Sequence, residues 1–147
     1  MSENFIEMEL REIQTTMDDP RDNPIIVLAE KNGTREFPIY IGPVEARALE
    51  DAVVGGPRLA EHLRRPMTHD LILNCIDGLG GKIERVLVTK LEKSTFIGAI
   101  ELRNANDEVV RVDSRPSDAM IIAMKRNSPV FVEEQVLLNV QPNAENP

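Results

Sequence analysis

The chain opens on an alternation of apolar and charged residues with a period of two, which is typical of a β-strand with one buried face. The alternation begins at Ile6 and predicts a first strand near residues 6–15. Later runs rich in Val, Ile and Phe predict further strands over residues 82–91, 95–103, 108–113 and 129–132. Much of the core is therefore expected to be built on a sheet.

A hairpin is predicted after the first strand. Two apolar runs, residues 25–30 and 35–41, flank Asn32-Gly33, and this dipeptide favours the positive φ angles of a two-residue turn. Pro38 has no amide proton, so the second arm is expected at a sheet edge or with its N–H side turned to solvent.

Two helices are predicted to begin at a proline, which is tolerated at the first helical position. The earlier one begins at Gly42-Pro43 and ends at Gly55-Gly56-Pro57. The later one begins at Arg115-Pro116, and its residues 119–124 are apolar nearly all round. The later helix is therefore expected to be the most deeply packed.

A further helix is predicted between these two. Thr68 is the expected N-cap, Asp70 suits the positive end of the helix dipole, and three glycines at 78, 80 and 81 end the helix. Its apolar stripe predicts a buried side made of Leu71, Ile72, Cys75, Ile76 and Leu79. A short helical segment is expected before it, through Leu59 and Leu63.

These elements predict a single α+β domain with a mostly antiparallel sheet. The sheet is expected to come from two strand-hairpin-strand-helix halves, with the extra helix between them. Each principal helix begins with Pro-x-acid-Ala, at Pro43 and at Pro116. This short identity is explained equally well by an internal duplication and by convergence on a good helix start. The domain is expected over residues 1–138, with a polar tail over residues 139–147.

Composition narrows the class of protein. The 147 residues suffice for one ordinary domain, and 17 basic against 25 acidic side chains give a net charge of −8, which excludes a histone-like binder of polyanions. Because Cys75 is the single cysteine, intrachain disulfides are excluded and a reducing compartment is expected. No apolar run approaches the roughly 18 residues of a membrane-spanning helix, so a cytoplasmic location is predicted.

The first candidate for chemistry is the pair His69 and Asp70, at the start of the middle helix. An imidazole beside a carboxylate can act as a base or as a metal ligand, and a helix N-terminus attracts anions. The structural alternative is that Thr68 and Asp70 cap the helix and that His69 is an exposed residue of its first turn.

The second candidate lies where a strand leads into the last helix. It consists of Asp113, Arg115, Ser117 and Asp118, and the Arg115 guanidinium could bind two phosphate oxygens there. The structural alternative is that Ser117 and Asp118 satisfy the helix start while Arg115 pairs with Asp113. Glu45 occupies the corresponding position in the earlier helix and is a secondary candidate.

Four segments carry a resemblance to a known family. In chain order they are Phe37-Pro-Ile-Tyr-Ile-Gly-Pro-Val-Glu-Ala46, Arg65-Pro-Met-Thr-His-Asp-Leu71, Val112-Asp-Ser-Arg-Pro-Ser-Asp-Ala119 and Pro129-Val-Phe-Val132. Together they resemble the bifunctional nuclease domain family, over about residues 8–138. The resemblance implies a small cytoplasmic α+β domain and nuclease activity on both DNA and RNA.

The resemblance and the two clusters together lead to a first hypothesis of function. It is a weak phosphodiesterase that acts on DNA and RNA, with or without the assistance of a metal ion. The expected catalytic residues are His69, Asp70, Asp113 and Asp118. Arg115 and Ser117 are expected to bind phosphate, and Glu45 is a secondary candidate. A divalent ion, Mg²⁺ or Mn²⁺, is expected to be held by Asp70, Asp113 and Asp118.

Two other hypotheses stay open. The acidic charge favours a non-catalytic module that recognises a small anion or a protein partner. The exposed edges of a small sheet favour a homo-oligomer, since edge strands are often protected by pairing with another chain.

Overall fold

The computed structural model describes residues 3–15, 23–55 and 65–140. The N-terminal half contains β1 (Phe5–Gln14), β2 (Ile25–Glu30), β3 (Glu36–Tyr40) and α1 (Pro43–Val54). The rest contains α2 (Thr68–Gly78), β4 (Lys82–Glu92), β5 (Thr95–Arg103), β6 (Val109–Ser114), α3 (Pro116–Arg126), β7 (Val130–Glu133) and α4 (Glu134–Val140). None of the helices in these ranges is long and apolar enough to cross a membrane.

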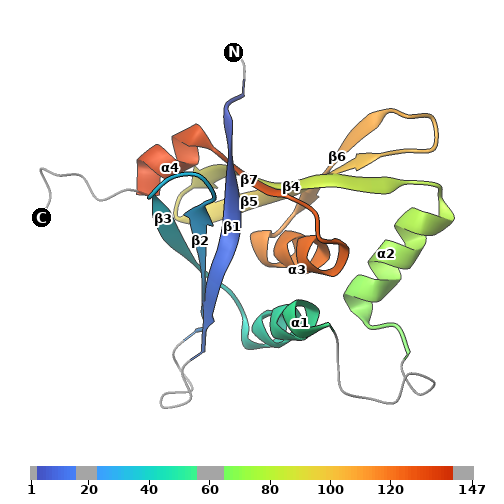
Figure 1. Ribbon diagram of the computed structural model, residues 1–147, viewed down its shortest axis with the longest axis horizontal. Coiled ribbons are helices and arrows are strands. Elements are labelled where there is room, and N and C mark those ends of the chain that lie inside the picture. The colour runs from blue at the N-terminus through green and yellow to red at the C-terminus, as the bar shows by residue number, and fades with distance from the viewer. Residues whose placement is uncertain (1–2, 16–22, 56–64, 141–147) are drawn as a thin grey trace, which may run out of the picture.

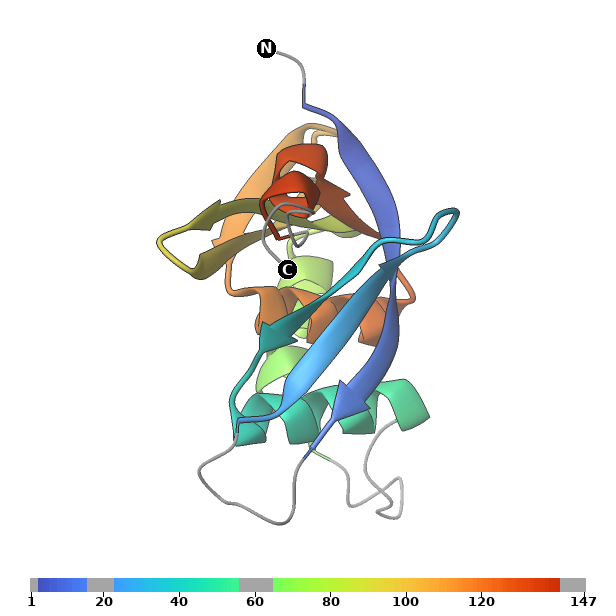
Figure 2. The ribbon, with the colours of Figure 1, turned by 90° about the vertical axis from the view of Figure 1, so that its left-hand side faces the viewer.

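The strands form a seven-stranded sheet in the order β3-β2-β1-β7-β4-β5-β6 within the described residues. Every neighbouring pair is antiparallel except β4 and β7. The sheet is strongly bent, so that β1–β3 run across β4–β6 (Figures 1 and 2). The predicted α+β class with a mostly antiparallel sheet is confirmed, and so is the place of Pro38 on an edge strand, β3.

The two predicted halves are visible in the topology. Strands β1–β3 form one antiparallel meander followed by α1, and β4–β6 form a second one followed by α3. Helix α2 lies between the halves in the sequence, as expected. Strand β7 joins the two meanders, because it pairs with β1 on one side and with β4 on the other.

Helix α3 lies on the concave side of the sheet, with α1 beyond it (Figure 2). It contacts α1, α2, β4 and β5. The expectation that this helix is the most deeply packed is confirmed, because more of its side chains are buried than in α1, α2 or α4. Its buried residues are Pro116, Ser117, Ala119, Met120, Ile121, Ile122 and Ala123.

The predicted buried side of α2 is wrong. Leu71 is 57% exposed and Leu79 is 80% exposed, Cys75 is also exposed, and Leu73 is the buried residue of this helix. Helix α2 lies at one end of the molecule (Figure 1). Its apolar stripe lines an open groove beside β5 and β6. An apolar stripe predicts which face of a helix is hydrophobic, but it does not show whether another part of the same chain packs against that face.

The predicted turn chemistry is also wrong in one place. Neither Asn32 nor Gly33 has a positive φ; instead the Glu30 carboxylate accepts hydrogen bonds from the backbone N–H groups of Thr34 and Arg35, at 3.1 and 2.8 Å. The tight turn lies between β4 and β5, at Lys93 (φ 49°) and Ser94 (φ 66°). A side-chain hydrogen bond can thus replace the turn that a dipeptide favours.

Two helix boundaries differ from expectation. Helix α2 begins at Thr68 with Met67, and not Thr68, as its N-cap, and the last strand is followed by a helix that was not predicted, α4. Val136 and Leu137 of α4 are buried, so tertiary packing holds this seven-residue helix. The short helix expected through Leu59 and Leu63 lies outside the described residues, and the division at residue 138 stays a prediction.

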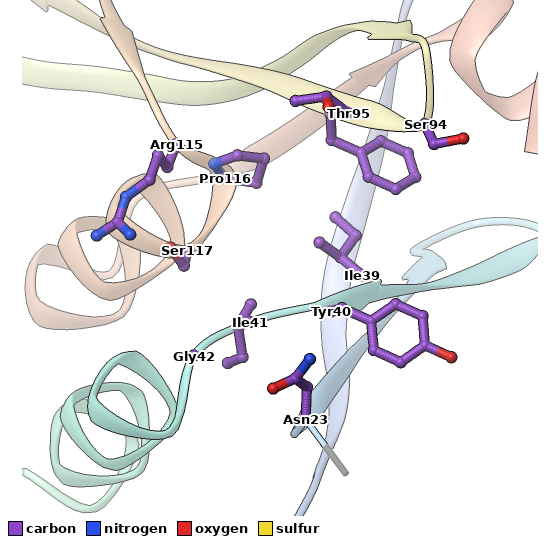
Figure 3. Close-up of a pocket in the computed structure, with 11 residues that line it drawn as sticks. Asn23, Ile39, Tyr40, Ile41, Gly42, Ser94, Thr95, Arg115, Pro116 and Ser117 are labelled. Carbon is purple, nitrogen blue, oxygen red and sulfur yellow. The ribbon is translucent and has the colours of Figure 1, made fainter. Parts of the chain in front are cut away.

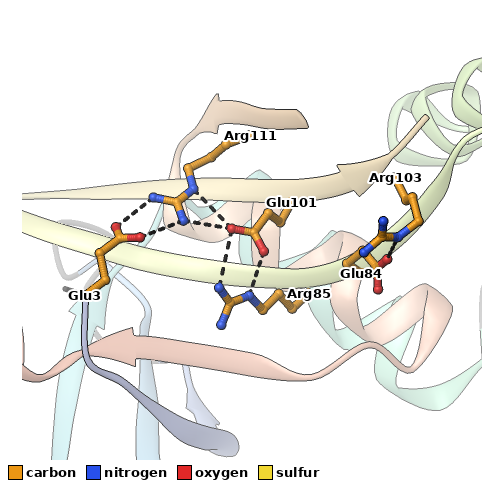
Figure 4. Close-up of polar contacts among 6 residues, drawn as sticks. All are labelled: Glu3, Glu84, Arg85, Glu101, Arg103 and Arg111. Atoms are coloured by element: carbon orange, nitrogen blue, oxygen red, sulfur yellow. Dashed lines mark hydrogen bonds and ion pairs between the residues drawn. The ribbon is translucent and has the colours of Figure 1, made fainter. Parts of the chain in front are cut away.

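A row of charged residues crosses β4, β5 and β6 on the sheet face opposite α3 (Figure 4). The buried Glu101 of β5 accepts hydrogen bonds from Arg85 Nε at 2.7 Å and from an Arg111 terminal nitrogen at 2.7 Å. Arg111 also pairs with Glu3, and the Arg85 guanidinium lies 4.8 Å from the centre of the Phe5 ring. The row therefore ties the N-terminal strand to the second meander.

Glu101→Gln is expected to lower the free energy of unfolding by about 2 kcal/mol near neutral pH, because both guanidinium groups lose a charged acceptor. Hydrogen bonds from Arg85, opposed by burial and helped by Arg111, hold the pKa of Glu101 below its ordinary value. The stabilisation is therefore present above the ordinary carboxyl range and is lost as the pH falls through it. Urea denaturation at several pH values measures this difference.

The matched control is Glu84→Gln. Glu84 pairs with Arg103 on the same two strands, but both side chains are well exposed (Figure 4). It is expected to change the free energy of unfolding by less than about 1 kcal/mol. Equal effects of the two substitutions would contradict a special role for the buried row.

Candidate active site

The two helix starts singled out by the sequence meet in one cleft of about 580 Å³. Its walls come from α1, the first turn of α2, the middle of β5, the end of β6 and the start of α3. The polar and charged lining residues are Glu45, Thr68, His69, Asp113, Ser114, Arg115 and Asp118, and the apolar ones are Val44, Ala48, Ile72, Ile100, Val112 and Ile122.

Ion pairs at the two ends of α2 fasten it to the last turn of α3. Lys125 Nζ lies 2.8 Å from Asp70 Oδ1, and Arg126 forms two hydrogen bonds with Asp77. The second oxygen of Asp70 accepts the Met67 backbone N–H at 2.9 Å and so caps the helix. These contacts hold α2 against α3, and His69 in the first turn of α2 reaches Asp118 near the start of α3.

His69 and Asp118 form a hydrogen-bonded pair across 49 positions of the chain, with 2.9 Å between Nε2 and Oδ1. An ionised carboxylate only accepts hydrogen bonds, so Nε2 carries the proton and donates it. In the neutral imidazole this assignment leaves Nδ1 as the nitrogen that can take up a proton. The pair thus has the arrangement that orients a general base in many hydrolases.

Arg115 completes the group from the other side. Its Nε donates to Asp118 Oδ2 at 2.8 Å, and a terminal nitrogen lies 3.6 Å from Glu45 Oε1. The Arg115 side chain is 64% exposed, so N–H groups of its guanidinium face solvent. Arg115 pairs with Asp118 and Glu45, and no ion pair with Asp113 is found among the described residues.

The ion pair between Asp118 and Arg115 shifts the pKa of both groups. Burial raises the pKa of Asp118, but hydrogen bonds from Arg115 and His69 outweigh it, so the pKa lies below its ordinary value. The same hydrogen bond to Asp118 raises the pKa of Arg115. At neutral pH the carboxylate is therefore charged, as the assigned protonation of His69 requires.

Gly98 of β5 allows this geometry. A Cβ atom there would lie 2.9 Å from the Ser114 carbonyl oxygen and 3.0 Å from the Pro116 nitrogen. These are backbone atoms, which cannot turn aside as a side chain can. The absence of a side chain at Gly98 therefore lets the connection from β6 to α3 approach the sheet, and this connection carries Arg115.

The structure separates the predicted site residues into two groups. Glu45, His69, Asp113, Arg115 and Asp118 line the cleft. Asp70 does not line it, because Lys125 and the α2 N-terminus hold its carboxylate. Ser117 faces a neighbouring pocket on the other side of Arg115.

The predicted metal ligands, Asp70, Asp113 and Asp118, are not brought together. Asp70 lies outside the cleft, and both oxygens of Asp118 already accept hydrogen bonds. Within residues 3–15, 23–55 and 65–140, no three His, Cys, Asp or Glu side chains gather in a way that could hold a metal ion. As folded, these residues do not fit a metal centre, and no catalytic step is assigned to one.

Sequence reasoning missed the partners that position the site. Lys125 was not singled out, because a basic residue in the last turn of a helix is common on dipole grounds alone. The cleft also has an apolar wall of Ile100, Val112 and Ile122, and the sequence pattern does not tell which apolar residues lie at the edge of a cavity.

Similarity to known proteins identifies the family of this chain. The chain matches the bifunctional nuclease domain family over residues 26–145. Two proteins of Mycobacterium tuberculosis strains, named Uncharacterized protein MT1877 and Uncharacterized protein Rv1829, are each 37% identical over 131 residues. That alignment covers 88% of this chain and 73% of each relative. The family match includes every residue of the cleft, and we conclude that the chain belongs to the bifunctional nuclease domain family.

Proposed function

We propose that this protein is a phosphodiesterase that hydrolyses DNA and RNA, with His69, Asp118 and Arg115 as the central residues. The observation that carries the proposal is the hydrogen-bonded chain from His69 through Asp118 to Arg115 on the wall of an open cleft. The name of the family supports the same class of reaction. The acidic surface, with a net charge of −8, favours a slow enzyme, because it opposes the approach of a polyanion.

In this reaction the neutral His69 takes a proton from a water molecule through Nδ1. The water oxygen bonds to phosphorus, the bond from phosphorus to the leaving sugar oxygen breaks, and that oxygen is protonated from solvent. Asp118 holds the imidazole in the required tautomer and stabilises its charged form. Arg115 donates hydrogen bonds to the phosphate oxygens, on which negative charge builds up. Asp113 and Glu45 border the cleft and limit which substrates fit.

The proposal is tested with purified protein on single-stranded RNA and duplex DNA, each with EDTA, Mg²⁺ or Mn²⁺. We expect slow cleavage of both nucleic acids, and dependence on a divalent ion stays a prediction that the EDTA arm decides. Cleavage that fails to copurify with the protein through two unrelated chromatography steps would contradict the proposal. Binding of nucleic acid without any cleavage would instead favour the non-catalytic module.

We further propose that the chain forms a homo-oligomer through β6. This strand ends the sheet and exposes Val109, Val110 and Val112, and it lacks a proline like Pro38 of the other edge. A groove of about 510 Å³ between α2 and β5–β6 adjoins it, lined by Leu71, Ile76 and Leu102 among others. Pairing of two β6 edges about a twofold axis would cover this apolar surface on both copies.

Light scattering is expected to give at least the mass of a dimer, and Val110→Lys is expected to lower it to the 16.5 kDa of one chain. A monomer at every concentration tested would contradict the oligomer. The cytoplasmic location also stays a prediction, and fractionation of cells tests it.

A further inference from the structure

A second pocket, of about 410 Å³, lies on the other side of Arg115 from the cleft. Figure 3 shows how it is built: α1 and α3 begin side by side on one wall, with Tyr40, Ser94 and Thr95 across from them. Asn23 lies at its mouth. Because Arg115 lines both spaces, a ligand in this pocket would adjoin one in the cleft.

Helix α3 presents an uncapped N-terminal end to the pocket. Its N-cap residue, Arg115, makes no side-chain capping hydrogen bond. Proline stands at the first position of both α1 and α3, so the first free N–H groups come from the second and third positions. In α3 the second position is Ser117, which lines the pocket, whereas in α1 these positions are Val44 and Glu45, which line the cleft instead. The positive end of the α3 dipole is therefore the one at the pocket. The Glu45 carboxylate, which folds back toward Gly42, lines the neighbouring cleft and is not among the pocket residues.

An independent observation at the same wall points to a ligand. Ser117 lines the pocket and is only 6% exposed, yet its hydroxyl has no hydrogen-bonding partner within the described part of the chain. A buried hydroxyl without a partner is costly, and such groups in native proteins call for an explanation. A ligand that accepts a hydrogen bond from this hydroxyl would supply the missing partner.

We infer that this pocket is a phosphate-binding subsite. A phosphate group matches the donors at the pocket wall, namely the Ser117 hydroxyl and the free backbone N–H of Ser117 at the start of α3. The identification of this phosphate as the neighbour of the scissile one in a nucleic-acid strand rests on the proposed function. The binding of phosphate itself does not, and it can be measured without turnover.

The chain carries its own reporter for the test. Tyr40 is its single tyrosine, the chain has no tryptophan, and the Tyr40 ring is 73% exposed at the pocket wall. Tyrosine emission is titrated with inorganic phosphate and with ribose 5-phosphate, at constant ionic strength, with ribose and N-acetyltyrosinamide as references. We expect a saturable change in emission with both phosphates and none with ribose.

Three variants make the test specific. Ser117→Ala is expected to weaken phosphate binding about tenfold or more without lowering the melting temperature of the free protein, because the hydroxyl has no partner to lose. Asn23→Asp is expected to weaken binding about three- to tenfold by placing a negative charge at the mouth. Asn74→Asp, on the exposed face of α2, makes the same change in net charge away from the pocket and is expected to leave binding unchanged.

The outcomes separate this inference from the proposed function. A linear, non-saturating change equal to that of N-acetyltyrosinamide would overturn the subsite, even if nucleic acid is hydrolysed. Unchanged affinity in Ser117→Ala together with a lower melting temperature would also overturn it, since the hydroxyl would then be structural. Saturable binding that the two pocket variants weaken would support the subsite, even if the nuclease assay fails.

Discussion

His69→Ala is expected to lower the rate of RNA and DNA cleavage by about 10²–10⁴-fold, the usual contribution of a positioned general base. The loss should appear in kcat, because the imidazole acts on the attacking water and not on the binding of the strand. Initial rates at several substrate concentrations separate the two effects. The melting temperature should fall as well, because the His69 side chain is only 13% exposed and its hydrogen bond to Asp118 is lost, so rates are compared at a temperature at which both proteins are folded.

The matched control is Asn74→Ala on the same helix. Asn74 is exposed and does not line the cleft, so its removal is expected to leave the rate unchanged. If His69→Ala cleaves at the wild-type rate, the assigned base is wrong. Family membership would then remain, but the cleft would have no demonstrated part in the chemistry.

Asp118→Asn is expected to lower the cleavage rate by about 10²–10⁴-fold, because the general base loses the carboxylate that fixes its tautomer. The carboxylate accepts hydrogen bonds from both His69 and Arg115, whereas an amide has one oxygen acceptor and would turn its NH₂ group toward one of these two donors. A positioning role also predicts that the loss appears in kcat and not in KM, because Asp118 orients the base and does not bind the strand.

Asp77→Asn is the matched control for this variant. Asp77 belongs to α2 and pairs with Arg126 of α3, so this ion pair also joins the two helices. Hydrogen bonds from Arg126 lower the pKa of Asp77, as those from Arg115 and His69 lower that of Asp118. A carboxylate with a lowered pKa stabilises the folded state above the ordinary carboxyl range and loses this contribution as the pH falls through it. In both variants the free energy of unfolding should therefore depend less strongly on pH in the acid range. Only Asp118→Asn should lose activity. Equal losses of activity would indicate that α2 docking, and not the cleft, is what matters.

The helix starts illustrate how far sequence reasoning reached. Pro43 and Pro116 mark the beginnings of α1 and α3 because their chemistry is local: proline fixes φ and needs no N–H at that position. Glu45, His69, Arg115 and Asp118 can be identified for a similar reason, since polar residues at the beginning of a helix can be recognised from local sequence alone. Whether these residues face one another is not readable, because 49 positions separate His69 from Asp118.

Asp70 and the stripe of α2 show where local patterns mislead. Asp70 looks like the natural partner of His69, yet Lys125 at the far end of α3 holds its carboxylate away from the cleft. Leu71 and Leu79 read as core, yet they face an open groove. In both cases the deciding contact comes from another element, and its placement depends on the packing of the whole molecule.

By itself the sequence determined the α+β class, two strand-and-helix halves, the edge position of Pro38 and the deep burial of α3, because these follow from periodicity and from the chemistry of single residues. The tertiary structure alone decided that His69, Asp118 and Arg115 share one cleft, that Asp70 stays outside it, and that α1 and α3 begin at a common pocket. Such proximity arises from the bend of the sheet and the docking of helices, and these depend on contacts between residues distant in the chain.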